Sequence, residues 1–459
     1  MYKKCRHIHF IGIGGIGMSG IAEILKLQGF NVSGCDENIN TKIVWHLKDI
    51  GCKIYQGHNK DHIKDVDVLV CSSAVNQKNE EVIAAMQKGI PVIPRAIMLA
   101  ELMRTKHGVA VAGAHGKTTT TSIISHILIE AGLDPTIIIG GILKNISMNA
   151  KLGEGNFLVA EADESDRSLL YLNPSIAVVT NIDADHLDTY KDLADIKQTF
   201  KDFLSRLPFY GKAFICIDDA NIRSILPLSH ISTVKYGFGK NADIRGEIVE
   251  LKKAVSIFDV FTHGKKLGRI TLNMPGEPNI LNSLAAIAIS LEFDVPFTKI
   301  KNALKNFKGI ERRFEFKGTY KGADIFDDYG HHPTEIKNSL MIAQKRTEKN
   351  LHVIFQPHRF SRTQKLWNEF VQAFSDNKKI KTLSLADIYP ASEAPIPGIT
   401  SQKLAQAIKE KNPSIKIFHS SCYEEIEKNV VKHLEPGDML LTQGAGKVNQ
   451  IAEKLAEEK

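Results

Sequence analysis

A short glycine-rich segment at 113–118 has the composition of a loop that binds the phosphates of a nucleotide. The letters Gly-Ala-His-Gly-Lys-Thr follow an apolar run at 108–112, typical of a buried parallel strand, and precede a helical pattern at 119–131. Glycines let consecutive backbone N–H groups face one phosphate, and a helix start adds unpaired donors. Lys117 is placed to reach the β- and γ-phosphates, and the Thr118 hydroxyl to bind Mg²⁺. The predicted nucleotide site comprises Gly113, Ala114, His115, Gly116, Lys117, Thr118 and Thr119.

This loop differs from the usual P-loop at one position. The pattern GxxxxGK[ST] requires glycine at position 111, where the chain has Val111, so that a shorter GxxGKT remains. The alternative is a connection that is merely rich in glycine and threonine. That alternative does not account for Gly-Lys-Thr at a strand-to-helix turn, so we favour the nucleotide site.

Acidic residues follow two predicted strands in the middle of the chain. The strand at 157–160 leads into Glu-Ala-Asp-Glu-Ser-Asp, and the strand at 176–179 leads into Thr-Asn-Ile-Asp-Ala-Asp-His-Leu-Asp. A complex of Mg²⁺ and nucleotide takes oxygen ligands from strand ends beside a phosphate loop. Either segment by itself is better explained as a solvated acidic loop. Next to the phosphate loop the two together favour a magnesium site, in which His186 becomes a candidate ligand.

The N-terminal residues fit a second phosphate-binding pattern. A strand at 7–11 leads into the glycine-rich turn 12–17 and a helix, and a second strand at 30–35 ends at Asp36. A GxGxxG turn followed about 20 positions later by an acidic residue is typical of a βαβ unit that binds a diphosphate, without specifying which one. A later strand at 66–71 ends in serine. The candidate residues in this region are Gly12, Gly14, Gly15, Gly17, Asp36 and Ser72.

The last third of the chain contains four predicted strands that each end in polar residues. They lie at 323–326, 351–355, 382–385 and 439–442. The carboxyl edge of an open parallel sheet is where α/β proteins bind their ligands. Arg359 and Arg362 share one loop at this edge, which suggests a fork for a carboxylate or a phosphate. Salt bridging within the fold is the commoner role of arginine and remains the alternative.

Two further segments of the middle region predict an extension of the sheet and the start of a helix. Alternating apolar residues within 233–269 favour an antiparallel addition to the sheet. Asn279 and Asn282 stand at the first turn of a predicted helix at 283–291, where capping is the default role of asparagine. Contact with a nucleotide base is the alternative for both.

The bulk composition fits a globular protein of several domains. At 459 residues the chain exceeds one ordinary core, and 43% hydrophobic and 24% charged residues are typical of globular proteins. The net charge of +7 includes no basic run beyond short lysine pairs, so we expect no nucleic-acid partner. No apolar segment is long enough to cross a membrane, so we expect no membrane association. Six scattered cysteines without CxxC or zinc-like spacing indicate reduced thiols and a cytoplasmic protein.

In combination, these segments resemble the Mur ligases of peptidoglycan synthesis. The resemblance spans the chain and rests on GIGGIGMSG, GAHGKTTTT, EADESD, TNIDADHLD, DDYGHHPTE, FQPHRFSRT, SEAPIPG and GAGK. It implies a three-domain α/β fold: a Rossmann-like domain at 1–106 for a UDP-sugar, a P-loop ATPase-type mixed sheet at 107–317 for ATP, and a Rossmann-like domain at 318–459 for an amino acid. The chain departs from the family pattern at Pro278, where histidine is usual, and at Ile97, where an acidic residue is common.

The resemblance also implies a reaction and residue roles. L-alanine would be joined to the carboxylate of UDP-N-acetylmuramate through an acyl phosphate, with ATP and Mg²⁺, by a monomer or homodimer. The glycine turn and Asp36 would then hold UDP instead of NAD. The implied magnesium ligands are Thr118, Glu161 and His186. The implied nucleotide contacts outside the phosphate loop are Asn279, Asn282 and Arg313. The implied catalytic residues are Lys117, His186, Asp328, His332 and Arg359. The implied substrate contacts in the last domain are His331, Arg359 and Arg362.

Three other interpretations of the sequence are open. A sister ligase of the same family attaches a preformed peptide to the same UDP-sugar, although GIGGIGMSG and FQPHRFSRT favour alanine by likeness. An NAD-dependent oxidoreductase accounts for the GxGxxG turn and Asp36, but not for the Gly-Lys-Thr loop or the acidic segments. A non-enzymatic ATP-binding switch leaves the polar loops of the last domain unexplained.

Overall fold

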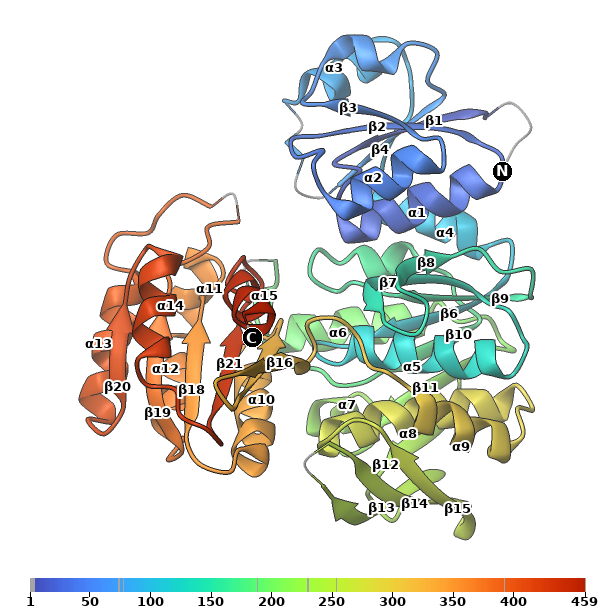
Figure 1. Ribbon diagram of the computed structural model, residues 1–459. Coiled ribbons are helices and arrows are strands. Elements are labelled where there is room, and N and C mark those ends of the chain that lie inside the picture. The colour runs from blue at the N-terminus through green and yellow to red at the C-terminus, as the bar shows by residue number, and fades with distance from the viewer. Residues whose placement is uncertain are drawn as a thin grey trace.

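The structure is a computed structural model that describes residues 5–72, 75–76, 78–187, 189–228, 231–252, 254–391 and 393–458. Asp188 of the second acidic segment and Ser392 of SEAPIPG lie outside these residues. The described residues form three sheets of five, ten and six strands. Figure 1 shows the first sheet stacked on the second and the third sheet beside the second. The predicted α/β fold with a central mixed sheet between two Rossmann-like parts is confirmed.

The N-terminal sheet is entirely parallel, with the strand order β3-β2-β1-β4-β5. Its strands are β1 (His7–Ile11), β2 (Asn31–Asp36), β3 (Lys53–Gln56), β4 (Val68–Cys71) and β5 (Val92–Pro94). Its helices are α1 (Ile16–Leu27), α2 (Lys42–Asp49), the 3₁₀ helix η1 (Lys60–Ile63), α3 (Glu80–Gln87) and α4 (Arg95–Met103). The chain runs outward in opposite directions from β1 and β4. The glycine turn after β1 and Ser72 after β4 therefore lie together at the switch point of the sheet.

The central sheet has the order β15-β14-β13-β12-β11-β10-β6-β9-β7-β8. Its strands are β6 (His107–Ala112), β7 (Thr136–Leu143), β8 (Met148–Lys151), β9 (Phe157–Glu161), β10 (Ile176–Val179), β11 (Lys212–Cys216), β12 (Ser232–Gly237), β13 (Ile244–Leu251), β14 (Ser256–Thr262) and β15 (Lys265–Leu272). Its helices are α5 (Lys117–Glu130), the 3₁₀ helix η2 (Ser168–Tyr171), α6 (Leu193–Leu204), α7 (Ala220–Ser224), α8 (Glu277–Glu292) and α9 (Phe297–Asn306). β6 lies between β9 and β10 and is parallel to both, so the phosphate loop and both acidic segments leave the sheet at one edge.

The predicted antiparallel addition is present as β13, β14 and β15. β12, which occupies the start of that region, pairs in parallel with β11 and β13 instead. The antiparallel part therefore begins one strand later than the alternating pattern suggested, because β12 still belongs to the series of parallel strands.

Helix α5 holds the phosphate loop at its first turn. Its N-cap is Gly116, whose φ of +82° lies in the left-handed region that glycine tolerates. The helix is buried from Thr118 to Leu128 and packs against α8 and β9. Gly132, at φ +83°, follows the C-cap and donates its N–H to the Ile129 carbonyl, as predicted for a helix-ending glycine.

The C-terminal sheet has the order β16-β17-β21-β18-β19-β20, with only the β16–β17 pair antiparallel. Its strands are β16 (Glu315–Tyr320), β17 (Ala323–Asp328), β18 (Leu351–Phe355), β19 (Ile380–Leu385), β20 (Lys416–His419) and β21 (Met439–Gln443). Its helices are α10 (Pro333–Arg346), α11 (Phe360–Lys365), α12 (Trp367–Ser375), α13 (Ser401–Lys411), α14 (Tyr423–Val431) and α15 (Asn449–Glu457). Pro333 occupies the first turn of α10, as predicted.

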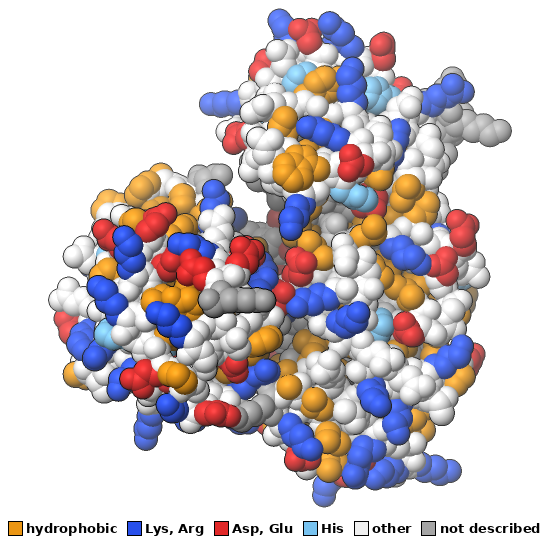
Figure 2. Space-filling model, in the orientation of Figure 1, with side chains coloured by type: hydrophobic (Ala, Val, Ile, Leu, Met, Phe, Trp, Pro, Cys, Tyr) orange, Lys and Arg blue, Asp and Glu red, His pale blue; other side chains and the backbone are white. Residues whose placement is uncertain are grey.

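The apolar core joins the first two parts of the molecule and leaves the third with cores of its own. Helix α1 packs against β7 and β8, and a Cβ on Gly20 would lie only 3.2 Å from the Ala150 side chain. Figure 2 shows a notch between the N-terminal and C-terminal parts, with charged side chains on both sides. No helix within the described ranges is long and apolar enough to cross a membrane.

Candidate nucleotide and substrate site

Lys117 lies at the centre of the predicted phosphate loop and is held by the protein itself. Its ammonium donates to the Gly113 carbonyl at 2.6 Å and to Oε1 of Glu164 at 2.7 Å. Burial disfavours the charged lysine, but the carboxylates of Glu164 and Asp163 outweigh it and raise the pKa of Lys117. Burial also raises the pKa of Glu164 to about 7, and its Oε2 has no hydrogen-bond partner among the described residues. The neighbouring carboxylates therefore favour the charged form of Lys117.

Two of the three predicted magnesium ligands are in direct contact. The hydroxyl of Thr118 donates to Oε2 of Glu161 at 3.2 Å, and Oε1 of Glu161 accepts the Gly140 N–H at 2.6 Å. His186 joins this group through Glu164, because its Nε2 lies 3.7 Å from Oε1 of that carboxylate. The predicted nucleotide contact Arg313 also reaches the group, with Nη2 3.4 Å from Oγ1 of Thr118.

A cavity of about 280 Å³ connects the N-terminal glycine turn to the phosphate loop. Its wall is formed from both parts of the molecule by Gly15, Gly17, Ser72, Arg95, Lys117, Gly140, Glu161 and Asp163, among others. Arg95 bridges the two parts, with Nη2 3.3 Å from Oδ2 of Asp163. Asp36 stabilises the turn from behind, because its Oδ2 accepts the Gly14 N–H at 2.9 Å. The N-terminal glycine turn and the first residue of α5 thus line the same cavity.

A second cavity, of about 360 Å³, lies on the other side of Gly116. It is lined by His115, Asn181, Asp219, Asn221, Tyr236, Pro278 and Asn282, among others. Asn282 accepts the Thr120 hydroxyl at 3.2 Å and so ties α8 to α5. Asn279 donates instead to the Pro275 carbonyl at 2.7 Å. The expected capping role of both asparagines is wrong, because the N-cap of α8 is Gly276.

The predicted residues after β17 divide into two groups. Asp328 is buried, and it accepts hydrogen bonds from the N–H groups of Phe314 and Gly330 and from the Ser339 hydroxyl. It therefore shapes the loop from inside. His332 is the N-cap of α10, and its ring centroid lies 5.0 Å from that of His115. The ring centroid of His331 lies instead 5.4 Å from that of His358.

The two predicted arginines line one small cavity together with His186. Arg362 is buried, and its Nη2 lies 3.5 Å from Oδ1 of Asp185 in the central part. Arg359 is more exposed and approaches Glu393, with 3.9 Å between Nε and Oε1. Its φ of +70° is unusual for a residue other than glycine, which marks a locally strained loop.

The sequence did not single out Thr334 and Glu335, which lie beside the predicted residue His115 and its neighbour Asp183. His115 lies 3.0 Å from Oδ2 of Asp183 and 3.6 Å from Oε1 of Glu335, so it connects the central and C-terminal parts. Burial alone would lower the pKa of His115, but these two carboxylates raise it to about 9. Thr334 donates to the same Asp183 at 2.8 Å. Asp183 belongs to a recognised acidic segment, whereas no local signal distinguished Glu335 from an ordinary helix-capping residue.

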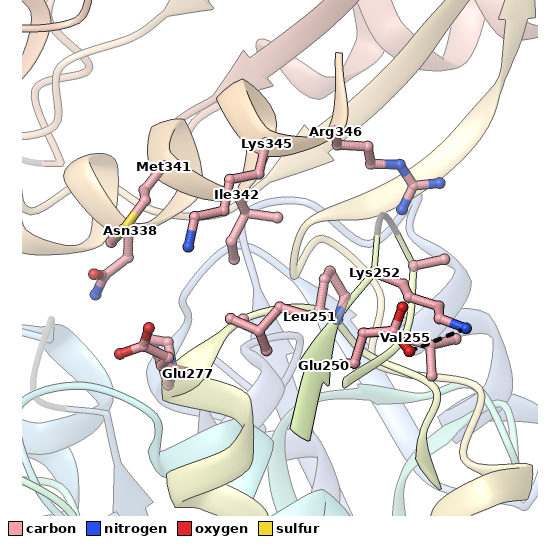
Figure 3. A pocket seen from close by; sticks show the side chains of 14 residues that line it. Glu250, Leu251, Lys252, Val255, Glu277, Asn338, Met341, Ile342, Lys345 and Arg346 are labelled. Atoms are coloured by element: carbon pink, nitrogen blue, oxygen red, sulfur yellow. Dashed lines mark ion pairs between the residues drawn. The ribbon is translucent and has the colours of Figure 1, made fainter. Parts of the chain in front are cut away.

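A further cavity of about 610 Å³ lies between residues 250–255, the start of α8 and the face of α10. Figure 3 shows Leu251, Val255 and Ile342 around it, with Lys345 at its edge. Of the positions singled out in the sequence, Pro278 alone lines it, and Pro278 also lines the cavity beside Gly116.

The fold and the phosphate-loop motif are those of a three-domain nucleotide-binding protein, and the candidate site lies where the three parts meet. Domain models of one family match almost the whole chain: "Mur ligase family, catalytic domain" at 7–107, "Mur ligase middle domain" at 111–290 and "Mur ligase, glutamate ligase domain" at 312–446. The chain belongs to the Mur ligase family.

Relatives with known names lie within this family. The chain is 50% identical over 457 residues to the UDP-N-acetylmuramate–L-alanine ligase of Geotalea uraniireducens (strain Rf4), covering 100% of this chain and 99% of that one. It is similar to the crystal structure of UDP-N-acetylmuramate-alanine ligase from Thermotoga maritima, with a TM-score of 0.83, 26% identity and 98% of both chains covered. A murein peptide ligase from Psychrobacter arcticus 273-4 shares the fold, with a TM-score of 0.74, 24% identity and 98% of both chains covered. Because that ligase shares the fold, the fold does not separate alanine from peptide as substrate.

Proposed function

We propose that this protein is an ATP-dependent ligase that joins L-alanine to the carboxylate of UDP-N-acetylmuramate. The single observation that supports it most is the cavity shared by the N-terminal glycine turn and Lys117. A ligase of this kind must bring a UDP-sugar carboxylate to the γ-phosphate of ATP, and this cavity is open to both patterns. Relatives of that name at about 50% identity over the full length agree with this substrate pair.

We infer a division of labour between the three parts. Residues 1–106 bind the UDP-sugar, 107–317 bind ATP, and 318–459 bind the amino acid. The base of ATP occupies the cavity beside Gly116, where Asn282 and Tyr236 supply polar and aromatic walls. The phosphates then extend over the first turn of α5 toward Lys117.

The first chemical step activates the carboxylate, which is a poor electrophile for an amine. Phosphoryl transfer from ATP forms an acyl phosphate and ADP, and Lys117 stabilises the negative charge on the moving phosphoryl group. Arg95 stands at the same cavity and supplies a second cation for the sugar carboxylate or its phosphate. Because both cations are already in place before the reaction, they lower the activation barrier for phosphoryl transfer without a cost for reorienting the site.

Thr118, Glu161 and His186 fit a magnesium site. Hydroxyl and carboxylate oxygens suit Mg²⁺, and Glu161 and Thr118 already lie in contact. Burial lowers the pKa of His186, so that its imidazole is neutral. Bound Mg²⁺ neutralises charge on the phosphates and aligns them. We expect Glu161→Gln to raise the Mg²⁺ concentration for half-maximal activity about tenfold or more, whereas the exposed control Glu154→Gln should leave it unchanged. An unaltered Mg²⁺ titration in Glu161→Gln contradicts this role.

In the second step the amino group of L-alanine attacks the acyl phosphate, an amide forms and phosphate leaves. Water competes with the amine, so the C-terminal part must close the site. Arg359 is the proposed contact for the alanine carboxylate, because it stands at the edge of the domain boundary, beside His186 and partly exposed.

Release of ADP by the full-length protein tests this function. UDP-N-acetylmuramate should support ADP release with L-alanine and to a lesser extent with L-serine or glycine, but not with a preformed L-alanyl peptide. A preference for the peptide would assign the protein to the sister ligase. Calorimetry should show binding of UDP-N-acetylmuramate and none of NADH, and the reverse result would restore the oxidoreductase interpretation.

A further inference from the structure

Metal-ligating side chains gather inside the N-terminal part, behind the glycine turn, whose Gly12 N–H donates to the Cys35 carbonyl. His9 on β1, Cys35 on β2 and Glu81 in the first turn of α3 are buried together, with one ligand atom of each within 4.8 Å of the others. His58 and His62, in the segment between β3 and β4, approach the same group. The cluster lies on the face of the sheet that packs against α3, whereas Ile8 and Phe10 face α1.

A chain of hydrogen bonds fixes the proton positions of His9. The Asp65 carbonyl can only accept, so Nδ1 of His7, 2.9 Å away, carries a proton and Nε2 of neutral His7 is bare. The Ser33 hydroxyl therefore donates to Nε2 of His7 at 2.8 Å, and its oxygen accepts from Nδ1 of His9 at 2.7 Å. Neutral His9 is thereby left with an unprotonated Nε2 that faces the cluster.

The unprotonated Nε2 of His9 faces the carboxylate of Glu81, which in turn contacts the Cys35 sulfur. Nε2 of His9 lies 3.3 Å from Oε2 of Glu81 and has no hydrogen-bond partner among the described residues. Oε2 of Glu81 lies 3.1 Å from Sγ of Cys35. A fully buried nitrogen lone pair beside a carboxylate is unfavourable unless a cation lies between them.

The spacing of the three side chains is close to that of ligands around one metal ion. Ligand bonds of about 2.0–2.3 Å in a tetrahedral zinc site place the ligand atoms roughly 3.3–3.6 Å apart. The contact of 3.3 Å between His9 and Glu81 falls in this range, and those of 3.1 Å from Cys35 to Glu81 and 3.2 Å from Cys35 to Nδ1 of His58 need only small movements. His58 contacts Cys35 but lies outside the three-residue group, so its side chain must move inward to become the fourth ligand.

An outer layer of hydrogen bonds supports this geometry. His62 Nδ1 lies 2.7 Å from Oε1 of Glu81, and the Asn59 N–H donates to the same oxygen at 2.9 Å. Ser33 orients His9 from the other side. Metal ligands are characteristically held by such partners, which fix the tautomer of a histidine and the direction of a carboxylate.

We propose that His9, Cys35, Glu81 and His58 form a structural site for one zinc-type divalent transition-metal ion. Binding replaces the thiol proton of Cys35, so that each metal ion that binds releases one proton and forms a metal–sulfur bond. The ion would link β1, β2, the segment after β3 and α3, which no disulfide joins because Cys35 and the other cysteines are free. The site serves the stability of the N-terminal part and takes no part in phosphoryl transfer.

Metal titration of the full-length protein tests this site. After removal of metals with a chelator, Co²⁺ is added in the presence of excess Mg²⁺, and the absorption spectrum and proton release are recorded. We expect one equivalent of Co²⁺ to bind with an intense thiolate-to-cobalt charge-transfer band and one released proton, and Zn²⁺ to displace it and raise the Tm. Cys35→Ser should abolish the band, whereas the matched control Cys52→Ser, at a buried cysteine outside the cluster, should keep it.

The absence of a stoichiometric charge-transfer band in wild-type protein would overturn the proposal and leave a hydrogen-bonded cluster only. A band that persists in Cys35→Ser would also overturn it, because the metal would then bind elsewhere. If circular dichroism shows that Cys35→Ser does not fold, Glu81→Gln serves as the second variant. It keeps the thiol and should lower Co²⁺ affinity at least tenfold, and unchanged affinity would count against the site.

Discussion

At the scale of single residues, Lys117 is notable because its ammonium is already bound by groups of the protein itself. Its ammonium is bonded to Glu164 and to the loop carbonyl at Gly113, within a group of carboxylates. Phosphate oxygens would offer the same ammonium a second set of anionic partners. In the proposed ATP site, Glu164 would therefore hold the charged lysine along the loop before ATP binds.

Lys117→Ala should lower ADP release at least about 100-fold, because it removes a cation from the path of the phosphoryl group. The single substitution also leaves Glu164 buried without its cation, which is destabilising. The double variant Lys117→Ala/Glu164→Gln should recover the wild-type melting temperature but not the activity. Near wild-type ADP release by a folded variant would show that the loop is not the phosphate site. Lys151→Ala, at a surface ion pair with Asp134, is the control.

Arg359→Ala should raise the KM for alanine by roughly one to two orders of magnitude, since loss of a charge-assisted contact costs about 1.5–3 kcal/mol. It should largely spare formation of the acyl phosphate, measured by positional isotope exchange in ATP with the UDP-sugar alone. Loss of exchange together with ligation would place Arg359 in the phosphate chemistry. Arg362→Ala is the comparison, and we expect it to impair both steps because Arg362 also contacts Asp185.

At the scale of elements, the turn between β6 and α5 is shaped by its neighbour α8. Gly116 sits at the N-cap of α5 against Asn282, and Asn282 is bonded to Thr120 one turn further along. Two helices from distant parts of the sequence thus fix one turn. This turn lies between the cavity proposed for the base of ATP and the cavity shared by Lys117 and the N-terminal glycine turn.

Gly116→Ala should raise the KM for ATP at least about tenfold. Its Cβ would lie 2.6 Å from Oδ1 of Asn282, at a backbone φ of +82°. Gly132→Ala is a matched control, because its φ is +83° but nothing lies within 4 Å of the added Cβ. We expect the control to lose only about 1 kcal/mol of stability from the left-handed backbone and to keep its ATP affinity. Equal effects of both substitutions on ATP would mean that Asn282 is not in the site.

At the scale of the whole molecule, the two interfaces differ in kind. The N-terminal and central parts share one apolar core, whereas the C-terminal part has its own cores and meets the central part through polar groups such as His115, Asp183, Glu335 and Thr334. Polar contacts exchange more readily with water than an apolar core does. Domain closure should therefore occur at the boundary of the C-terminal part.

The contact through His115 predicts a dependence of stability on pH. Its pKa is raised to about 9 in the fold, from about 6.5 when unfolded, so imidazolium stabilises the folded state. The contribution, on the order of 3 kcal/mol, is complete below about pH 6.5 and disappears as the pH rises through about 9. The Tm difference between wild type and His115→Gln should therefore shrink from pH 6 to pH 9.5. The other titratable neighbours are His332 and the two carboxylates Asp183 and Glu335, which stay ionised in this pH range. A Tm difference that does not change with pH would contradict the charged state of His115.

Much of the fold was predictable because its signals are local. Strands β1, β10 and β18 have the bounds or nearly the bounds that apolar runs predict, and Pro333 and Gly132 begin and end helices as expected. The error at Asn279 and Asn282 has a physical cause. Capping was predicted from position in the sequence, but α8 begins earlier, at Glu277, with Gly276 as its N-cap. The roles of the individual site residues stay predictions.

The sequence by itself determined which residues could bind phosphate and that they would meet, because parallel strands bring their carboxyl ends to one edge of a sheet. Only the tertiary structure decided the long-range pairs, such as His115 with Glu335 and Lys117 with Glu164. The same is true of His9, Cys35 and Glu81, whose spacing matches no local metal pattern. Strand order and the packing of α3 on the sheet bring these three side chains together. Their spacing along the chain does not predict this packing.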